Sequence, residues 1–319
     1  MTHTSSGNGG FSRYPSVESL KGILPGLEFR ARVLSLVRKS FDALGYLEVE
    51  TPCGILAPAA EEYIEAPAAG DFFLRTSPEL QMKRLLAAGM EKIYQIGPCF
   101  REGENGPRHK SEFTMLEYYE CGVDYLTLLE HTLQVIRETA MALHKDLLLP
   151  LPDGKKLDLG KCEIISVREA FRKAGENADK CAEEEGLFEL VLVDKVEPEL
   201  PSDRLCVLMD YPIRFGAFAR PKKSDLTLAE RWELYGRGLE LANAYGELID
   251  PVIQKERFRA FAETRKRQNL RTYPEPEAFL EAIEYGIPEA SGAAMGFDRL
   301  VMLLSGAKNI GEISFPLDS

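Results

Sequence analysis

The chain has 319 residues, enough for one large domain or two small ones, and its composition is that of an ordinary globular protein. It has 39 Lys and Arg residues against 51 Asp and Glu residues, a formal charge of −12, which argues against a protein that coats nucleic acid. Six cysteines without a CxxC pair give no readable zinc or disulfide framework, and no signal peptide or membrane-length apolar run is found, so a cytoplasmic protein without a membrane segment is expected.

The first residues are rich in Ser, Gly and Asn, and we expect 1–20 to be disordered and 21–319 to form one domain. The segment 28–44 has apolar residues at helical spacing, and Gly45 is expected to close that helix. A short alternating strand then runs to Pro52. A long helix followed by such a strand often forms a dimer interface, and packing within the chain is an equally good interpretation.

The stretch 71–75 predicts a strand that leads directly into a helix. Ser77 is a suitable N-cap, Pro78 suits the first helical position, and Glu79 lies in the first turn. Glu79 could complement the helix dipole, or it could hold a ligand amine at this strand-to-helix corner.

The stretch 100–119, FREGENGPRHKSEFTMLEYY, predicts a strand, a polar loop and a return strand. Alternation puts Phe113, Met115, Glu117 and Tyr119 on one face of the return strand. That face offers an aromatic ring for a base and a carboxylate for an amine. The loop beside it has cations that suit a polyphosphate: Arg101, Arg108, His109 and Lys110. The alternative is an amphipathic hairpin with a solvated basic loop.

Four further segments are interpreted as structural. Asp124 is expected to cap a core helix, and Ser166 with Glu169 predicts a second capping box. The acidic segment 176–200 is expected to be irregular and without a site. The stretch 204–212 predicts a buried strand.

The segment 230–250, ERWELYGRGLELANAYGELID, predicts a hairpin with a type II′ turn at Gly236-Arg237. In that register Glu233 faces Glu240 directly. Two opposed like charges predict a cation between them, and with phosphate nearby that cation would be Mg²⁺. A slipped register with both carboxylates in water is the alternative.

Simple alternation would turn Asn243 and Glu247 away from the face that carries Glu240. If all three serve one pocket, the strand must contain a bulge near Ala242, and we predict that bulge.

The C-terminal part contains a charged amphipathic helix over 252–270, to which no site is assigned. The stretch 291–304, SGAAMGFDRLVMLL, follows it. Its small residues allow a close backbone approach to a ligand. Arg299 lies at a helix start, where the helix dipole disfavours a cation, and this suggests an anionic partner.

Three blocks, GYLEVETP, FRE…RHKSEFTMLEYY and GAAMGFDR, resemble motifs 1, 2 and 3 of the class II aminoacyl-tRNA synthetases in order. The stretches RTSPELQMKRL, EFTMLEYY, ERWELYGRGLELANAYGEL and GFDRLVML look like the catalytic domain of lysyl-tRNA synthetase. The resemblance covers about Gly26 to the C-terminus. It implies an α+β fold, the class II aminoacyl-tRNA synthetase catalytic fold with an antiparallel β-sheet flanked by helices, and a homodimer.

Lysyl-tRNA synthetases carry an N-terminal oligonucleotide-binding domain of about a hundred residues that reads the anticodon. Because only some 25 residues precede the first expected helix, we expect no anticodon recognition. This length resembles the elongation factor P–(R)-β-lysine ligase family, which activates β-lysine with ATP and places it on a lysine side chain of elongation factor P. Lysyl-tRNA synthetases have glycine at the position of Ala294, whereas the ligase family has alanine. The methyl group of Ala294 would crowd an α-amino group.

The resemblance implies a site for ATP and Mg²⁺. Arg101 would hold the α-phosphate and the substrate carboxylate and stabilise charge at the reacting phosphorus. His109 and Arg299 would grip the β- and γ-phosphates, and Phe113 would stack on adenine. Glu233 and Glu240 would bind Mg²⁺, and the catalytic residues would be Arg101, Arg299 and Glu240. The implied ATP-binding set is Arg101, Glu102, Gly103, Glu104, His109, Lys110, Phe113, Glu240, Leu241, Gly296 and Arg299.

The resemblance also implies an amino-acid site. Glu247 and Tyr119 would receive the ε-ammonium group of (R)-β-lysine, and Glu79 and Glu117 its other amine. Asn243 would bind the carboxylate. The implied substrate-binding set is Ser77, Pro78, Glu79, Glu117, Tyr119, Asn243, Glu247 and Ala294.

Three departures from the lysyl pattern leave alternatives open. Arg-Glu-Gly-Glu replaces Arg-Asn-Glu, so either Glu102 or Glu104 could contact adenine. Lys110-Ser111 replaces Asn-Pro, and Ala244-Tyr245 stands where Gly-Phe is usual, close to the amine pocket. The same chemistry with α-lysine, another amino acid or another acceptor is one alternative, and an inactive regulatory paralogue is another.

Overall fold

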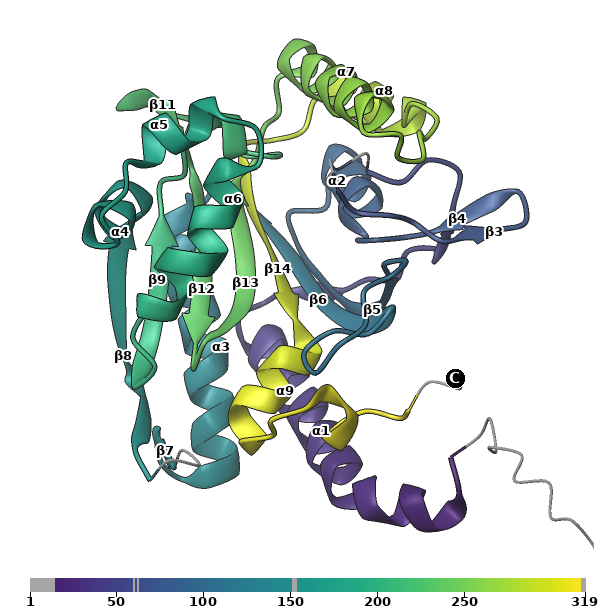
Figure 1. The fold of residues 1–319 in the computed structure, drawn as a ribbon. Coiled ribbons are helices and arrows are strands. Elements are labelled where there is room, and N and C mark those ends of the chain that lie inside the picture. Colours follow the sequence, from purple (N-terminus) through teal and green to yellow (C-terminus); the bar gives the residue numbers. More distant parts are fainter. Residues whose placement is uncertain (1–14, 60, 62, 151–153, 317–319) are drawn as a thin grey trace, which may run out of the picture.

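The computed structural model describes residues 15–59, 61, 63–150 and 154–316 (Figure 1). Most of the N-terminal stretch expected to be disordered, residues 1–14, lies outside the described residues. Helix α1 begins at Val17, so residues 17–20 of that stretch are helical. No helix in the described parts of the chain combines the length and apolar character needed to cross a membrane. All six cysteines are described and free.

Among the described residues, nine strands form one sheet that is mainly antiparallel, as the α+β prediction required (Figure 1). Two pairs within this sheet, β1 with β5 and β8 with β9, are parallel. Parallel neighbours need crossover connections, which helical segments supply in both cases. In spatial order the strands are β1 (Leu47–Glu48), β5 (Lys92–Phe100), β6 (Glu112–Cys121), β14 (Ala290–Gly296), β13 (Leu239–Gly246), β12 (Arg231–Gly236), β9 (Arg204–Met209), β8 (Lys156–Ser166) and β7 (Leu148–Pro150).

One face of the sheet packs against three helices and forms the main core (Figure 1). These are α1 (Val17–Ala43), α3 (Tyr125–His144) and α9 (Phe297–Ser305). Alternate residues of the strands, such as Leu116 of β6 and Leu234 of β12, point to this face. The fully buried Trp232 belongs to it too, and its indole N–H donates to the Tyr125 carbonyl at 2.7 Å. Asp124 caps α3 as predicted.

Helix α1 is joined to this core by an ion pair whose acidic partner is buried and whose basic partner is partly exposed. Arg30 donates to the carboxylate of Asp298, the second residue of α9, and to the Thr114 hydroxyl at 2.8 Å. The second carboxylate oxygen of Asp298 accepts from the Thr114 backbone N–H at 2.7 Å. The first helix, the third motif and the return strand of the second motif therefore meet at one point.

The other face of the sheet is covered at its two ends and left open between them (Figure 1). One end carries α2 (Glu79–Ala87), α7 (Pro251–Arg267) and α8 (Glu277–Tyr285), and the other carries α4 (Val167–Lys173) and the helical segment that follows it. Small elements complete the described fold: β2 (Gly54–Ile55), β3 (Ala68–Ala69), β4 (Phe72–Leu74), β10 (Pro221–Lys222), β11 (Asp225–Ala229), η3 (Ile213–Phe215) and η4 (Ile310–Glu312).

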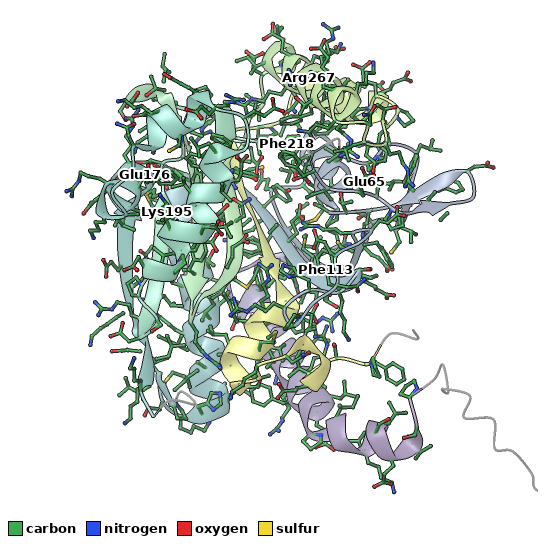
Figure 2. The ribbon with its side chains drawn as sticks, in the orientation of Figure 1. Glu65, Phe113, Glu176, Lys195, Phe218 and Arg267 are labelled. Atoms are coloured by element: carbon green, nitrogen blue, oxygen red, sulfur yellow. The ribbon has the colours of Figure 1, made fainter. Side chains whose placement is uncertain are left out.

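The segment 176–200 is helical, which corrects the prediction of an irregular stretch. It contains α5 (Ala178–Glu183), α6 (Leu187–Val191), a π-helical turn η1 (Leu192–Val196) and a 3₁₀ turn η2 (Glu197–Glu199). Apolar residues such as Phe188 and Val196 are buried in a second core, so packing outweighs the acidic composition. Figure 2 labels Glu176 and Lys195, whose ion pair of 2.5 Å spans this segment.

Candidate active site

A cavity of about 340 Å³ opens on the uncovered face of the sheet. One face of β6, β14, β13 and β12 forms its floor, and the loop between β5 and β6 borders it. Phe113 and Phe218, both labelled in Figure 2, lie on its wall. Phe113, Met115, Glu117 and Tyr119 all line the cavity, which confirms the predicted alternation of the return strand. Leu116 and Tyr118 point into the core on the other side.

Cross-strand pairing arranges the floor in rows. One row runs over four adjacent strands and consists of Glu117, Ala294, Asn243 and Glu233, and the next consists of Tyr119, Gly292, Tyr245 and Arg231. A Cβ atom at Gly292 would lie 2.2 Å from the Tyr119 ring. The glycine therefore makes room for a wall residue of the cavity, where the sequence suggested close approach to a ligand.

The β12–β13 hairpin differs from its predicted register. The turn residues are Arg237 and Gly238, with φ of 57° and 69°, as a type I′ turn requires, and this turn matches the twist of the strands. Glu240 therefore pairs with Tyr235, and Glu233 pairs with Asn243, so the two glutamates do not face each other directly.

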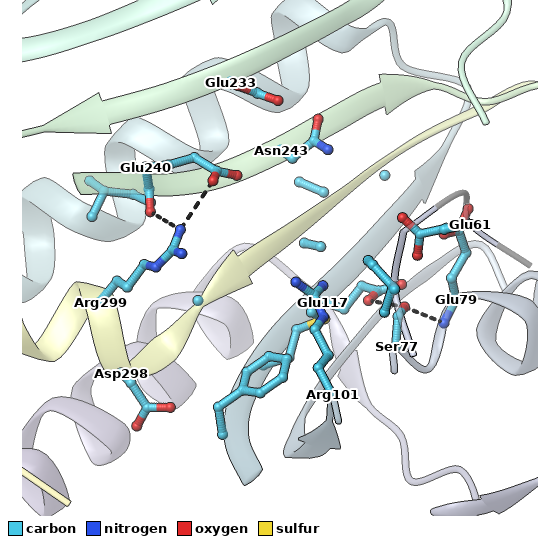
Figure 3. Close-up of a pocket in the computed structure, with 18 of the residues that line it drawn as sticks. Glu61, Ser77, Glu79, Arg101, Glu117, Glu233, Glu240, Asn243, Asp298 and Arg299 are labelled. Carbon is cyan, nitrogen blue, oxygen red and sulfur yellow. Dashed lines mark hydrogen bonds and ion pairs between the residues drawn. The ribbon is translucent and has the colours of Figure 1, made fainter. Parts of the chain in front are cut away.

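The predicted bulge is confirmed. The register shifts between Leu234 and Tyr235, which leaves Leu241 as the extra residue beside Ala242. Because of it, Glu240, Asn243 and Glu247 all line the same cavity together with Glu233. The two carboxylates expected to bind metal are thus on one face but diagonal to each other, as Figure 3 shows.

One end of the cavity is rich in cations. Arg101 lies over the Phe113 ring, with its guanidinium carbon 5.1 Å from the ring centre, and its Nη1 is 3.7 Å from Glu104. Its Nε is buried and has no hydrogen-bond partner among the described residues. A buried, unsatisfied guanidinium nitrogen in a cavity wall is a donor for an anionic ligand.

Arg299 and His109 lie together at this end. Arg299 Nη2 donates to His109 Nε2 at 2.6 Å, and its Nη1 donates to the Glu240 carbonyl and carboxylate at 2.8 and 3.1 Å (Figure 3). Burial, and then the nearby Arg299 charge, lower the pKa of His109, which favours a neutral imidazole. The position of Arg299 at the start of α9 is therefore explained by partners across the cavity.

Glu233 and Glu240 fit a magnesium site made of two carboxylates. Glu233 is held by the Tyr211 and Tyr235 hydroxyls at 2.6 Å and by Arg231 Nη2 at 2.5 Å, and one lone pair of its Oε1 is left over. Within the described residues no group of three or more His, Cys, Asp or Glu residues could hold a metal. Oxygen ligands of this number suit Mg²⁺ that is also bound by phosphate and water.

Three buried carboxylates, Glu79, Glu117 and Glu247, line the opposite end of the cavity, and Lys83 pairs with two of them without lining it. We call these four residues the acidic end. Glu117 accepts from the Tyr119 hydroxyl at 2.6 Å and from the Ser77 hydroxyl at 2.8 Å. Burial, with a contribution from Glu79, raises the pKa of Glu117 to about 8, and burial raises the pKa of Glu247 to about 7. Burial destabilises the charged form of these carboxylates, and an ammonium group bound beside them would stabilise it, so they are suited to bind amines.

Ser77 and Pro78 differ from their predicted roles. Pro78, not Ser77, occupies the N-cap position of α2, and it does not line the cavity. The Ser77 hydroxyl still accepts from the Glu79 N–H at 2.9 Å while it donates to Glu117. Ser77 thus joins the start of α2 to the acidic end, and Pro78 sets only the backbone at this corner.

The loop after Arg101 separates its two glutamates. Glu104 lines the cavity, whereas Glu102 Oε2 is 3.1 Å from Arg271 Nη1 outside it, and Gly103, with φ of 82°, is a turn residue. Of the two candidates for an adenine contact, the geometry favours Glu104. Lys110 borders the cavity, but its ammonium group donates to Ser314 and to the Phe315 carbonyl.

The remaining predicted residues, Leu241 and Gly296 in the ATP set and Ala294 in the substrate set, line the cavity. Sequence analysis did not predict several residues of the site. Lys83 pairs with Glu79 without lining the cavity, and the lining residues that were missed are Arg231, Glu61, Ile64, Phe218 and Ile310. Lys83 lies four residues after Glu79 and Arg231 two before Glu233, so helical and strand periodicity could have placed both. Glu61 lies in an irregular segment, which carries no such signal.

Known proteins match the chain over most of its length. The family model described as tRNA synthetases class II (D, K and N) matches residues 19–319. A lysine–tRNA ligase of Pelotomaculum thermopropionicum is 35% identical over 91% of this chain, which spans 63% of that protein. Elongation factor P–(R)-β-lysine ligases of Erwinia tasmaniensis and Haemophilus influenzae are also 35% identical over 91% of this chain, and it spans 94% of each of them.

The family resemblance drawn from the three motifs is thus confirmed, and the cavity lies on the residues that carry those motifs. The chain belongs to the class II tRNA synthetases of the D, K and N group.

Proposed function

We propose that this protein uses ATP to activate (R)-β-lysine as an aminoacyl-adenylate and transfers it to a lysine side chain of elongation factor P. The observation that carries the proposal is one cavity with a cationic end, where Arg101 has an unsatisfied buried nitrogen, and an acidic end with three buried carboxylates. The cationic end suits a nucleoside triphosphate, and the acidic end suits a substrate with two amines. Class II synthetases use ATP, typically with Mg²⁺.

In the first step a carboxylate oxygen of the amino acid attacks the α-phosphorus, the bond to the bridging oxygen breaks, and pyrophosphate leaves. Arg101 orients the carboxylate and α-phosphate, and Arg299 with His109 holds the leaving pyrophosphate. Glu233 and Glu240 would hold Mg²⁺, which would supply charge neutralisation for the phosphates. In the second step the acceptor amine forms an amide bond, AMP leaves, and a proton is released.

Two observations favour (R)-β-lysine over α-lysine. Ala294 stands between Glu117 and Asn243 in the floor row, so its methyl group faces the space between the expected amine and carboxylate subsites. A methyl group there disfavours an amine on the α-carbon by about 1–3 kcal/mol. In addition, the chain spans 94% of two elongation factor P–(R)-β-lysine ligases. α-Lysine or another acceptor is the alternative.

The test is incubation with ATP, elongation factor P and either (R)-β-lysine or α-lysine in separate reactions, followed by intact-mass measurement. We expect one lysyl group to be added to elongation factor P much faster with (R)-β-lysine. Faster modification with α-lysine would overturn the substrate assignment. Pyrophosphate exchange without modification of elongation factor P would overturn the proposed acceptor. The absence of exchange with any amino acid would favour an inactive paralogue.

Amino-acid affinity is expected to depend on pH through the acidic end. The pKa values of Glu117 and Glu247 are raised to about 8 and about 7, so both lose protons between pH 6 and 8, and ammonium binding favours the charged forms. The KM for (R)-β-lysine should therefore fall, by up to about tenfold per pH unit, as pH rises through this window. The KM for ATP, measured in the same pyrophosphate-exchange series, should change far less.

The same shifts should lower stability as pH rises. Because the carboxyl groups bind protons more tightly in the folded chain than at their ordinary pKa of 4.5, protonation stabilises the fold below that value. This stabilisation is lost as pH rises to about 8. A Tm without substrate that is higher at pH 8 than at pH 6 would contradict this origin of the pH dependence.

Tyr245→Phe isolates a single hydroxyl group in the amino-acid site. Asn243 Nδ2 donates to the Tyr245 hydroxyl at 2.8 Å, while Arg231 Nε donates to Asn243 Oδ1 at 3.2 Å. Loss of one hydrogen bond of about 1 kcal/mol should raise the KM for (R)-β-lysine about fivefold and leave the KM for ATP unchanged. An unchanged amino-acid KM would mean that the hydroxyl does not orient Asn243.

Dimerisation through α1 and β1 and a cytoplasmic location stay predictions. Sedimentation of the purified protein tests the first.

A further inference from the structure

Lys83 is a buried cation to which the proposed reaction gives no role. It lies on α2 one turn after Glu79, and its side chain is 1% exposed. Its ammonium group is 2.5 Å from Glu79 Oε1 and forms a second ion pair with Glu247. The rings of Phe218 and Tyr119 enclose it, with centres at 5.2 and 5.8 Å. One ammonium group thus bridges two carboxylates that come from a helix and from the end of β13.

The charges of the acidic end do not balance. When its carboxylates are ionised, as ammonium binding requires, three carboxylates and one ammonium group leave two negative charges, and all four residues are buried. A buried charge without a partner is strongly unfavourable, so this end of the cavity favours a ligand that brings two positive charges. A substrate with two ammonium groups meets that requirement, whereas a monoamine leaves one charge uncompensated.

We infer that Lys83 is a positioning residue that sets the selectivity for a diamino acid. By bridging Glu79 and Glu247 it fixes the spacing of the carboxylates that receive the two amines, and it reduces the charge of the acidic end to the value that two ammonium groups neutralise. This inference rests on the proposed function, because it concerns the amino-acid subsite of that reaction. Lys83 itself does not touch the reacting atoms.

Removing the bridge should change amino-acid binding and leave nucleotide binding intact. In Lys83→Met the two carboxylates repel each other, and the acidic end carries three negative charges. We expect the KM for (R)-β-lysine in pyrophosphate exchange to rise about 30- to 100-fold, which is the loss expected when a buried charge pair is broken. The KM for ATP should stay within about twofold, because Arg101, Arg299 and His109 lie at the other end of the cavity.

Lys92→Met is the matched control. Lys92 pairs with Glu120 at 2.7 Å on neighbouring strands of the same sheet, lies over the Tyr46 ring, and does not line the cavity. It should lose stability in thermal unfolding without a change in either KM. If Lys83→Met also leaves the amino-acid KM within twofold, Lys83 is only structural and the inference is wrong.

Lys83→Arg covers the case in which Lys83→Met does not fold. It keeps the positive charge but replaces a point charge with a planar fork, which changes the spacing of Glu79 and Glu247. The amino-acid KM should rise while the ATP KM does not, and an unchanged amino-acid KM would overturn the inference. Failure of the wild-type protein to exchange with any amino acid would instead refute the proposed function.

Discussion

Arg101→Ala is expected to remove nearly all ATP-dependent activity and to lower kcat/KM for pyrophosphate exchange by about 10²- to 10³-fold. Arg101 has a buried Nε without a partner and lies against Phe113 at the cationic end of the cavity. A preorganised donor of this kind stabilises charge that develops in the transition state, and its loss costs about 3–4 kcal/mol. Arg101→Lys should recover only part of the rate, because a point charge cannot replace the planar fork.

Arg204→Ala is the control for this experiment. Arg204 forms an exposed ion pair with Asp203 at 2.9 Å and does not line the cavity, so exchange should stay at the wild-type rate. Thermal unfolding of each variant separates a loss of catalysis from a loss of fold. If Arg101→Ala folds and keeps more than about a tenth of wild-type kcat/KM, the assignment of Arg101 to the reacting phosphate is wrong.

Arg30→Met is expected to cost about 3–5 kcal/mol of unfolding free energy. Its partner Asp298 is 4% exposed, and the substitution would leave that carboxylate buried with only the Thr114 N–H as a donor. Breaking a buried pair from one side costs this much because an uncompensated charge is left behind. Urea unfolding followed by circular dichroism measures the change.

The double variant Arg30→Met with Asp298→Asn tests the physical origin of that loss. Removing the stranded charge should restore part of the stability lost in Arg30→Met alone, since the penalty belongs to the unpaired carboxylate. Arg204→Met, which breaks the exposed pair with Asp203, should cost less than about 1 kcal/mol. A loss below 1 kcal/mol in Arg30→Met would show that Asp298 does not depend on Arg30 in the folded chain.

Sequence analysis predicted those parts of the fold and site that depend on local periodicity. The period of two along 112–121 was sufficient to place Phe113, Glu117 and Tyr119 on one face, and the cavity confirms it. The predicted turn of the second hairpin was wrong by one position. Both Gly236-Arg237 and Arg237-Gly238 can form a two-residue turn, and the twist of the strands decides between them. Moving the turn by one residue changes the partner of Glu233 from Glu240 to Ala242, and the extra residue Leu241 moves that partner one further, to Asn243.

Features that depend on tertiary contacts could not be predicted in this way. The rows that bring Glu117, Ala294 and Asn243 together come from strands far apart in the sequence. The separation of Glu102 from Glu104 depends on Arg271, a residue beyond the end of α7. The helical segment 176–199 was missed because its acidic composition conceals the apolar residues that pack it.

The additional residue in β13 is a position where this strand can lose a residue without turning its neighbours. Loss of the codon for Leu241 would keep the reading frame and the turn, and Ala242 would still pair with Leu234 and Asn243 with Glu233. An inserted residue between Ala242 and Glu247 would instead turn Glu247 toward the apolar layer. We therefore expect descendants of this chain to tolerate a deletion at Leu241 better than an insertion further along the strand.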